Sequence, residues 1–225
     1  MSEFATTLIR ADTAASPAAE WPRLGRIAAA LTLVVGASCQ LLSFGLTPDH
    51  AETADRLVWI AEDTAQAQAA KVFDVLAMPL LVGTAIVYFL LARRRAPKLA
   101  WAGGILLVTG MVGLSMVQGA ETLLYALVDD GRFDLATLAD AMDDISTPSA
   151  IGMLLLFLPG AFFGVILLGA ALWRSRTVPR GAVVLMYLFL LVDIVLGRGF
   201  IGHVISLAAA TWIAVTVLAS RPASG

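Results

Sequence analysis

The chain has 225 residues, of which 59% are hydrophobic and 14% are charged, and its formal net charge is -2. Soluble domains carry about 25% charged residues, so this composition excludes an ordinary soluble domain and indicates a polytopic membrane protein that resides in a lipid bilayer. The single cysteine, Cys39, excludes an internal disulfide. No basic stripe points to a nucleic-acid partner.

Six apolar runs are long enough to cross the hydrocarbon core, for which a helix needs about 20 residues. They cover residues 27–46, 72–92, 99–127, 148–173, 181–197 and 199–219. The sequence therefore predicts an all-α fold with six transmembrane helices in a single domain, residues 23–221. Residues 1–22 are predicted to be a disordered tail, and residues 222–225 a second, shorter tail.

The first run contains GASC, which ends at Cys39 and resembles a lipoprotein cleavage site only faintly. The run continues past it through LLSFGL, whereas the apolar part of a signal peptide spans about 7–15 residues. We therefore expect this run to be retained as a helix, with Cys39 as a small packing residue.

The distribution of lysine and arginine predicts the orientation of the chain, because cytoplasmic loops are enriched in both. Most of the 15 lysines and arginines lie in the N-terminal tail, in RRRAPK, in RSRTVPR and at the C-terminal end. These segments are predicted to be cytoplasmic, so the chain is expected to lie in a bacterial inner membrane with both termini on the cytoplasmic side. The acidic loops between the other helix ends are then outside.

Two of the outer loops have helical patterns of their own. Residues 53–70 have the composition of a helix, and in residues 133–145 an apolar stripe repeats at helical spacing: Leu135, Leu138, Met142 and Ile145. We expect short helices here. They either cover the ends of the bundle or lie in the membrane interface.

Three ionisable residues interrupt the last two apolar runs. Arg198 lies between two glycines in a predicted tight turn, with Asp193 five residues before it and His203 five residues after it. In an antiparallel hairpin these spacings place Asp193 and His203 at a similar depth, about 7 Å from the turn. The hairpin thus brings an acid, a base and a cation together.

Other predicted helices carry polar residues at the same outer level. Helical spacing places Gln118 and Glu121 on one face, and Lys71 on one face with Asp74, while Gln40 lies in the outer half of the first helix. The inner halves of the helices are almost entirely apolar. Polar side chains therefore gather in the outer third of the bundle.

This gathering has two interpretations. Ionisable groups inside a membrane cost about 2.5–3.5 kcal/mol each, so they usually face the bundle interior and pair. They could line an outward-open pocket, with these candidate ligand-binding residues: Gln40, Asp74, Gln118, Glu121, Asp193, Arg198 and His203. Alternatively, Asp193–Arg198 and Lys71–Asp74 are salt bridges that tie helix ends, while His203 and Glu121 reach the interface.

Cofactor motifs are missing from the sequence. GRGFIG matches a dinucleotide fingerprint formally, but no strand precedes it. Only His203 of the two histidines lies in an apolar run, no lysine lies in the middle of one, and no metal-binding motif is present. We expect no cofactor and no metal. Gly160 and Gly164 form a GxxxG pattern that predicts close helix packing within the chain or, less simply, a dimer seam.

Two stretches resemble a family of six-helix, actinobacterial-type membrane proteins of unknown function. They are RLGRIAAALTLVVGASCQLL, which resembles the family's opening, and LGAALWRSRTVPRGAVVLM, which resembles its basic loop between helices four and five. The chain departs from the family in the fifth helix, where it reads LLVDIVLGRGFIGH. The resemblance implies an architecture and no activity.

Three functions remain open on the sequence alone. The first is a protein that binds or transports a small or amphiphilic ligand at an outward-facing pocket. The second is a membrane-embedded acid/base enzyme that acts on a lipophilic substrate, in outline like a terpenoid cyclase, with Asp193 and Glu121 as acid and base and His203 as the orienting residue. The third is a structural or regulatory subunit of a membrane complex, or an oligomer.

Overall fold

The computed structural model describes residues 17–48, 52–143, 147–195, 197 and 199–220. Within these residues every regular element is a helix, which confirms the all-α prediction. Arg198 and Ile145, both used in the sequence argument, lie outside the described residues.

Five helices are long and apolar enough to cross a membrane. They are α2 (Arg23–Leu46), α4 (Thr64–Ala92), α5 (Pro97–Asp130), α7 (Pro148–Ser175) and α9 (Gly199–Ala219). Large apolar side chains such as Leu31, Trp101, Leu155 and Val215 are exposed on their outer surfaces, as expected for helices in lipid. The chain is thus a multi-pass membrane protein.

The fifth predicted run, residues 181–197, is divided in the structure. Its first part is α8 (Arg180–Leu190), and its second part is η2 (Leu191–Val195), a π-helical turn that contains Asp193. Neither piece alone has the length of a membrane-spanning helix, so the sixth crossing stays a prediction. Turns of π-helix are rare, and they occur often at functional sites.

The helices form a closed ring. Going around it, α2 contacts α4, α4 contacts α5, α5 contacts α7, α7 contacts α8, α8 contacts α9, and α9 returns to α2. Glycines allow the closest approach, between α5 and α7: a Cβ on Gly164 would lie 2.5 Å from the backbone nitrogen of Leu107, and one on Gly160 would lie 2.7 Å from Cα of Gly110. The GxxxG pattern therefore packs within the chain, as predicted.

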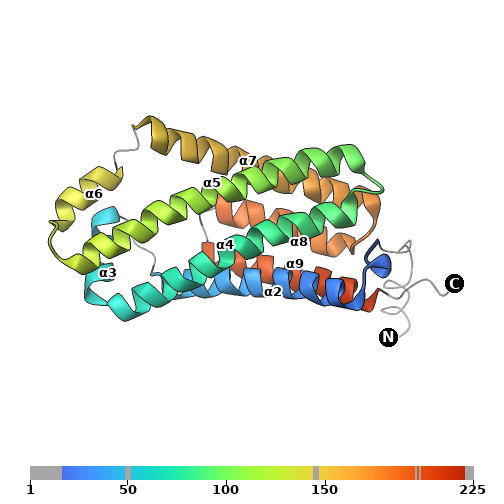
Figure 1. Cartoon of the computed structure of the whole chain (residues 1–225), viewed down its shortest axis with the longest axis horizontal. Coiled ribbons are helices and arrows are strands. Elements are labelled where there is room, and N and C mark those ends of the chain that lie inside the picture. The colour runs from blue at the N-terminus through green and yellow to red at the C-terminus, as the bar shows by residue number, and fades with distance from the viewer. Residues whose placement is uncertain (1–16, 49–51, 144–146, 196, 198, 221–225) are drawn as a thin grey trace.

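The two ends of the ring differ (Figure 1). At one end, here called the termini end, η1 (Pro17–Glu20) lies near the last turn of α9, and Arg26 donates a hydrogen bond to the carbonyl of Ser220. Part of the predicted tail is packed here, since Ala18 is buried in the main core. The basic turn between α4 and α5 lies at the same end, where Arg94 pairs with Glu20.

At the opposite end, here called the loop end, two short helices lie together (Figure 1). They are α3 (Thr53–Glu62) and α6 (Leu135–Asp143), the loop helices that the sequence predicts. Leu57 and Ile60 of α3 pack with Ala139 of α6 and with Leu124 and Val128 on the last turns of α5. This small core explains the length of α5, whose 34 residues extend about 50 Å, beyond the thickness of the hydrocarbon.

Candidate functional site

A cluster of charged side chains lies at the loop end, where α3, α4 and α5 meet. Lys71 is its centre: Nζ lies 3.2 Å from Oδ2 of Asp74 and 3.0 Å from Oε2 of Glu121, and it donates a hydrogen bond to Oε1 of Gln118. Arg56 of α3 binds the other oxygen of Glu121 at 3.0 Å. These five residues are called the Lys71 cluster below.

The local sequence explains why these side chains meet. Lys71 and Asp74 are one turn apart on α4, and Gln118 and Glu121 are one turn apart on α5, so each pair projects from a single face. The helices α4 and α5 run side by side, which turns these two faces toward each other. The Lys71 cluster contains two cations and two carboxylates, so its formal charges cancel.

A second set of polar residues continues from Asp74 across the bundle to α9. Gln40 of α2 donates a hydrogen bond to Oδ1 of Asp74 over 3.1 Å, and Oε1 of Gln40 lies 3.2 Å from Nε2 of His203. Nδ1 of His203 lies 2.7 Å from the carbonyl oxygen of Gly199 and 3.7 Å from Oδ1 of Asp193. A continuous polar chain therefore joins α3 to the π-helical turn.

Aromatic rings and a glycine hold the His203 end of this chain. The ring of Phe44 stacks on the imidazole with 4.1 Å between centroids, and Phe189 approaches it edge-on. A Cβ on Gly202 would lie 2.8 Å from Cβ of Asp193, so only glycine lets η2 lie so close to α9. The imidazole is buried, and its position is fixed on several sides.

A hollow of about 290 Å³ lies beside the Lys71 cluster. All five residues of the cluster line it, together with Ser43, Phe44, Thr47, Pro48, Ala70 and Tyr125. Its volume lies near the lower end of the range for small-molecule binding sites, about 300–1,000 Å³. The charged groups thus pair directly with one another and also border an open space, so the two interpretations of the sequence are not exclusive.

The structure separates the predicted site residues into two groups. Asp74, Gln118 and Glu121 line the hollow, whereas Gln40 connects Asp74 to His203. The ion pairs of Glu121 are with Arg56 and Lys71, at the far end of the polar chain from Asp193. Asp193 and Glu121, the predicted acid/base pair, thus lie at opposite ends of the row of polar residues. The catalytic role of each stays a prediction.

Arg56 and Tyr125 also border the hollow, although neither is among the site residues predicted from the sequence. Arg56 belongs to a loop helix, and the packing of α3 against the last turns of α5 brings it to Glu121. Burial alone would lower the pKa of Arg56, but the Glu121 carboxylate more than offsets this, and the pKa is above its ordinary value. Tyr125 follows Glu121 by one turn on α5, a spacing that could have placed it in the predicted set; Nζ of Lys71 lies 5.6 Å from the centre of its ring.

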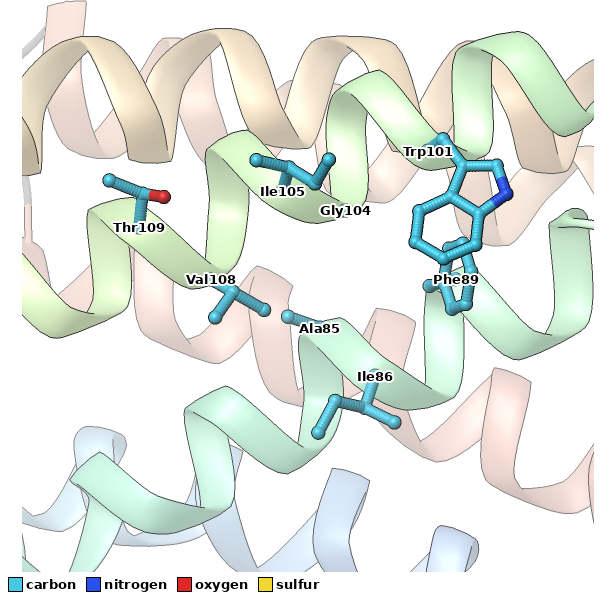
Figure 2. Close-up of a pocket in the computed structure, with 8 residues that line it drawn as sticks. All are labelled: Ala85, Ile86, Phe89, Trp101, Gly104, Ile105, Val108 and Thr109. Carbon is cyan, nitrogen blue, oxygen red and sulfur yellow. The ribbon is translucent and has the colours of Figure 1, made fainter.

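A second hollow, of about 270 Å³, lies between α4 and α5 nearer the termini end (Figure 2). Its walls are apolar: Phe89 and Trp101 meet at one side, Val108 and Ala85 lie opposite, and Thr109 carries the one side-chain oxygen drawn in the view. It suits a hydrocarbon chain and offers little to bind a polar group. In the described part of the chain, no three His, Cys, Asp or Glu side chains are grouped closely enough to hold a metal ion.

Comparison with known proteins adds no assignment. No family model matches the chain, and no match is found among curated proteins or solved structures.

Proposed function

We propose that the chain is a protein of the bacterial cytoplasmic membrane whose hollow at the loop end binds a small or amphiphilic ligand from outside the cell. In this proposal the termini end is cytoplasmic and α8 with η2 makes the sixth crossing. The position of the basic turns supports the orientation, because the segments that contain Arg93–Arg95 and Arg176 lie at the end of the ring opposite the Lys71 cluster.

The observation that carries the proposal is the hollow bordered by four charged side chains. Lys71 and Asp74 are each less than 10% exposed, and burying such groups is costly unless they are paired or have a function. Pairing alone would be served best by close packing, yet an open space of about 290 Å³ remains beside them. Binding sites typically combine such a space with a few convergent polar groups.

The lining indicates which ligands are suitable. Arg56 and Lys71 offer donors, Asp74 and Glu121 offer acceptors, and their formal charges cancel, so a zwitterionic or neutral polar head group is matched better than a simple ion. Phe44 and Pro48 supply an apolar wall for the adjoining part of an amphiphile. The space holds a head group and a few methylenes, not a complete lipid.

Dodecylphosphocholine, a single-chain zwitterionic amphiphile, is a suitable probe. Added to the full chain in dodecyl maltoside, it is expected to raise the melting temperature with a saturable dependence on concentration. Ser43→Leu fills the hollow and should abolish this rise, whereas Ser115→Leu, the same change on α5 away from the hollow, should retain it. An equal rise in the two variants would show that the hollow is not the binding site.

A further inference from the structure

The hydrogen bonds of His203 determine where its protons lie. Nδ1 is 2.7 Å from the carbonyl oxygen of Gly199, one turn earlier on α9. A carbonyl oxygen only accepts, so Nδ1 must carry a hydrogen and donate it. In a neutral imidazole the other nitrogen, Nε2, then has a lone pair and must accept.

The side-chain amide of Gln40 lies between His203 and Asp74. One end of the amide is 3.2 Å from Nε2 of His203, and the other end is 3.1 Å from Oδ1 of Asp74. An amide has one donating end and one accepting end, so it offers opposite partners to the two groups. Whichever way the amide is turned, one neighbour must donate and the other must accept.

Two arrangements satisfy every one of these contacts. In the first, the amide NH₂ donates to an ionised Asp74, and the amide oxygen accepts from Nε2 of a doubly protonated His203. In the second, the amide is turned by half a turn: its NH₂ donates to Nε2 of a neutral His203, and its oxygen accepts from a protonated Asp74. A neutral His203 beside an ionised Asp74 leaves a buried contact between two acceptors, which is costly.

We propose that His203, Gln40 and Asp74 form a proton-binding site that holds one proton shared between its two ends. The two arrangements differ by one proton, which moves from Nε2 of His203 to Oδ1 of Asp74, and by a half turn of the Gln40 amide. Asp74 borders the hollow at the loop end, and His203 lies beside Asp193 in the π-helical turn. Proton position in this site therefore changes the charge of the hollow.

Charged groups on the surrounding helices act on both ends. Lys71 of α4 and, beyond it, Glu121 of α5 and Arg56 of α3 face Asp74, and Tyr125 of α5 lies against Lys71. At the other end, Asp193 of η2 faces Nδ1 of His203 and stabilises its charged form, while Phe44 of α2 and Phe189 of α8 shield the ring. Lys71 stabilises the ionised form of Asp74 and so favours the first arrangement. Burial disfavours a charge on either Asp74 or His203 and so favours the second.

Nitrogen NMR of the full chain with ¹⁵N-labelled histidine tests the proposal. The chain has two histidines, so the variant His50→Gln assigns the signals of His203. The two ring nitrogens distinguish the charged imidazole from each neutral tautomer. The protonation of Asp74 is read in the same sample from the infrared band of a protonated carboxyl group that disappears in Asp74→Asn.

The proposal expects one of two results near neutral pH: a charged His203 with no Asp74 carboxyl band, or a neutral His203 protonated at Nδ1 together with that band. A neutral His203 with an ionised Asp74, protons on both groups, or a neutral ring protonated at Nε2 would overturn it. Both readings are taken on the parent site, and Asp74→Asn serves only to assign the carboxyl band.

A second measurement examines the linkage through the amide. In Gln40→Leu the two groups should titrate independently, whereas Gln118→Leu, which removes the amide that binds Lys71, should leave one shared proton. If the protonation of His203 and Asp74 is the same in Gln40→Leu as in the parent chain, the amide does not couple them and the proposal fails.

Discussion

Nζ of Lys71 lies 3.0 Å from Oε2 of Glu121, and this contact joins α4 to α5 beside the hollow. Lys71 also binds Asp74, so a single buried ammonium group compensates two carboxylates from different helices. Arg56 extends the same network to α3, outside the ring. The Lys71 cluster is thus both a structural junction and the border of the candidate binding site.

Replacing Lys71 should be strongly destabilising. Lys71→Met leaves Asp74 without its cation in a buried position, and breaking a buried pair in this way costs about 3–5 kcal/mol. Thermal unfolding in dodecyl maltoside measures the loss. Lys98→Met, at an exposed position near the start of α5, is the matched control and should change the stability by no more than about 0.5 kcal/mol. Similar melting temperatures for the two variants would contradict the role given to Lys71.

The close packing of α7 on α5 should make the stability sensitive to a methyl group added at the contact. Gly164→Ala introduces a methyl group 2.5 Å from the backbone of Leu107, so the helices must move apart, at a cost of about 1–3 kcal/mol. Gly152→Ala, on the same helix, meets no atom within 4 Å. The free energy of unfolding should fall in the first variant and stay unchanged or rise in the second, since alanine favours a helix over glycine.

The contact between Arg56 and Glu121 should hold α3 on the bundle. In Arg56→Gln we expect faster amide hydrogen exchange in Thr53–Glu62, because the small core of Leu57 and Ile60 then lacks its ionic anchor. Arg132→Gln removes an exposed pair with Asp130 and should leave this exchange unchanged. Because the pKa of Arg56 is raised above an already high value, its charge persists throughout the range in which the protein can be studied.

The start of α6 should respond to acid. Asp134 accepts hydrogen bonds from the backbone N–H and the hydroxyl of Thr137, and the backbone bond is the main cause that lowers the pKa of Asp134. A lowered folded-state pKa means that this stabilisation is present above the ordinary aspartate pKa and is lost as the pH falls through the lower, folded value. Hydrogen exchange in α6 should accelerate over that acidic range, and Asp134→Asn should remove most of the pH dependence.

Local sequence patterns predict the helices more completely than they predict which helices pack against one another. The length of the apolar runs predicts the five long helices, and the apolar stripe at helical spacing in residues 133–145 predicts α6, because both patterns depend on residues close together in the chain. The spacing of the predicted hairpin places Asp193 and His203 at one depth, and Oδ1 of Asp193 lies 3.7 Å from Nδ1 of His203. The division of the fifth run at η2 does not follow from its apolar length, because LLVDIV is apolar on both sides of its one charged residue, Asp193.

The spacing of residues along the sequence does not predict contacts between residues that are far apart in the chain. Gln40 and His203 are 163 positions apart, and their contact depends on α9 returning to α2 to close the ring. Arg56 lies in a stretch that is predicted to form a loop helix, but nothing in the neighbouring residues indicates that α3 places it against Glu121. Helical periodicity determines which face of a helix is polar, but only the packing of all the helices determines which polar faces meet.

The most direct test of the account is whether water and a small solute reach the hollow. In a chain whose only thiol is introduced by Ser43→Cys, with Cys39→Ala, a membrane-impermeant methanethiosulfonate reagent added to right-side-out vesicles should modify position 43. The same thiol introduced by Ser115→Cys should be far less reactive, and dodecylphosphocholine should slow the reaction at position 43. Equal reactivity at the two positions, or reaction at position 43 only from the cytoplasmic side, would contradict an outward-facing binding site beside Lys71.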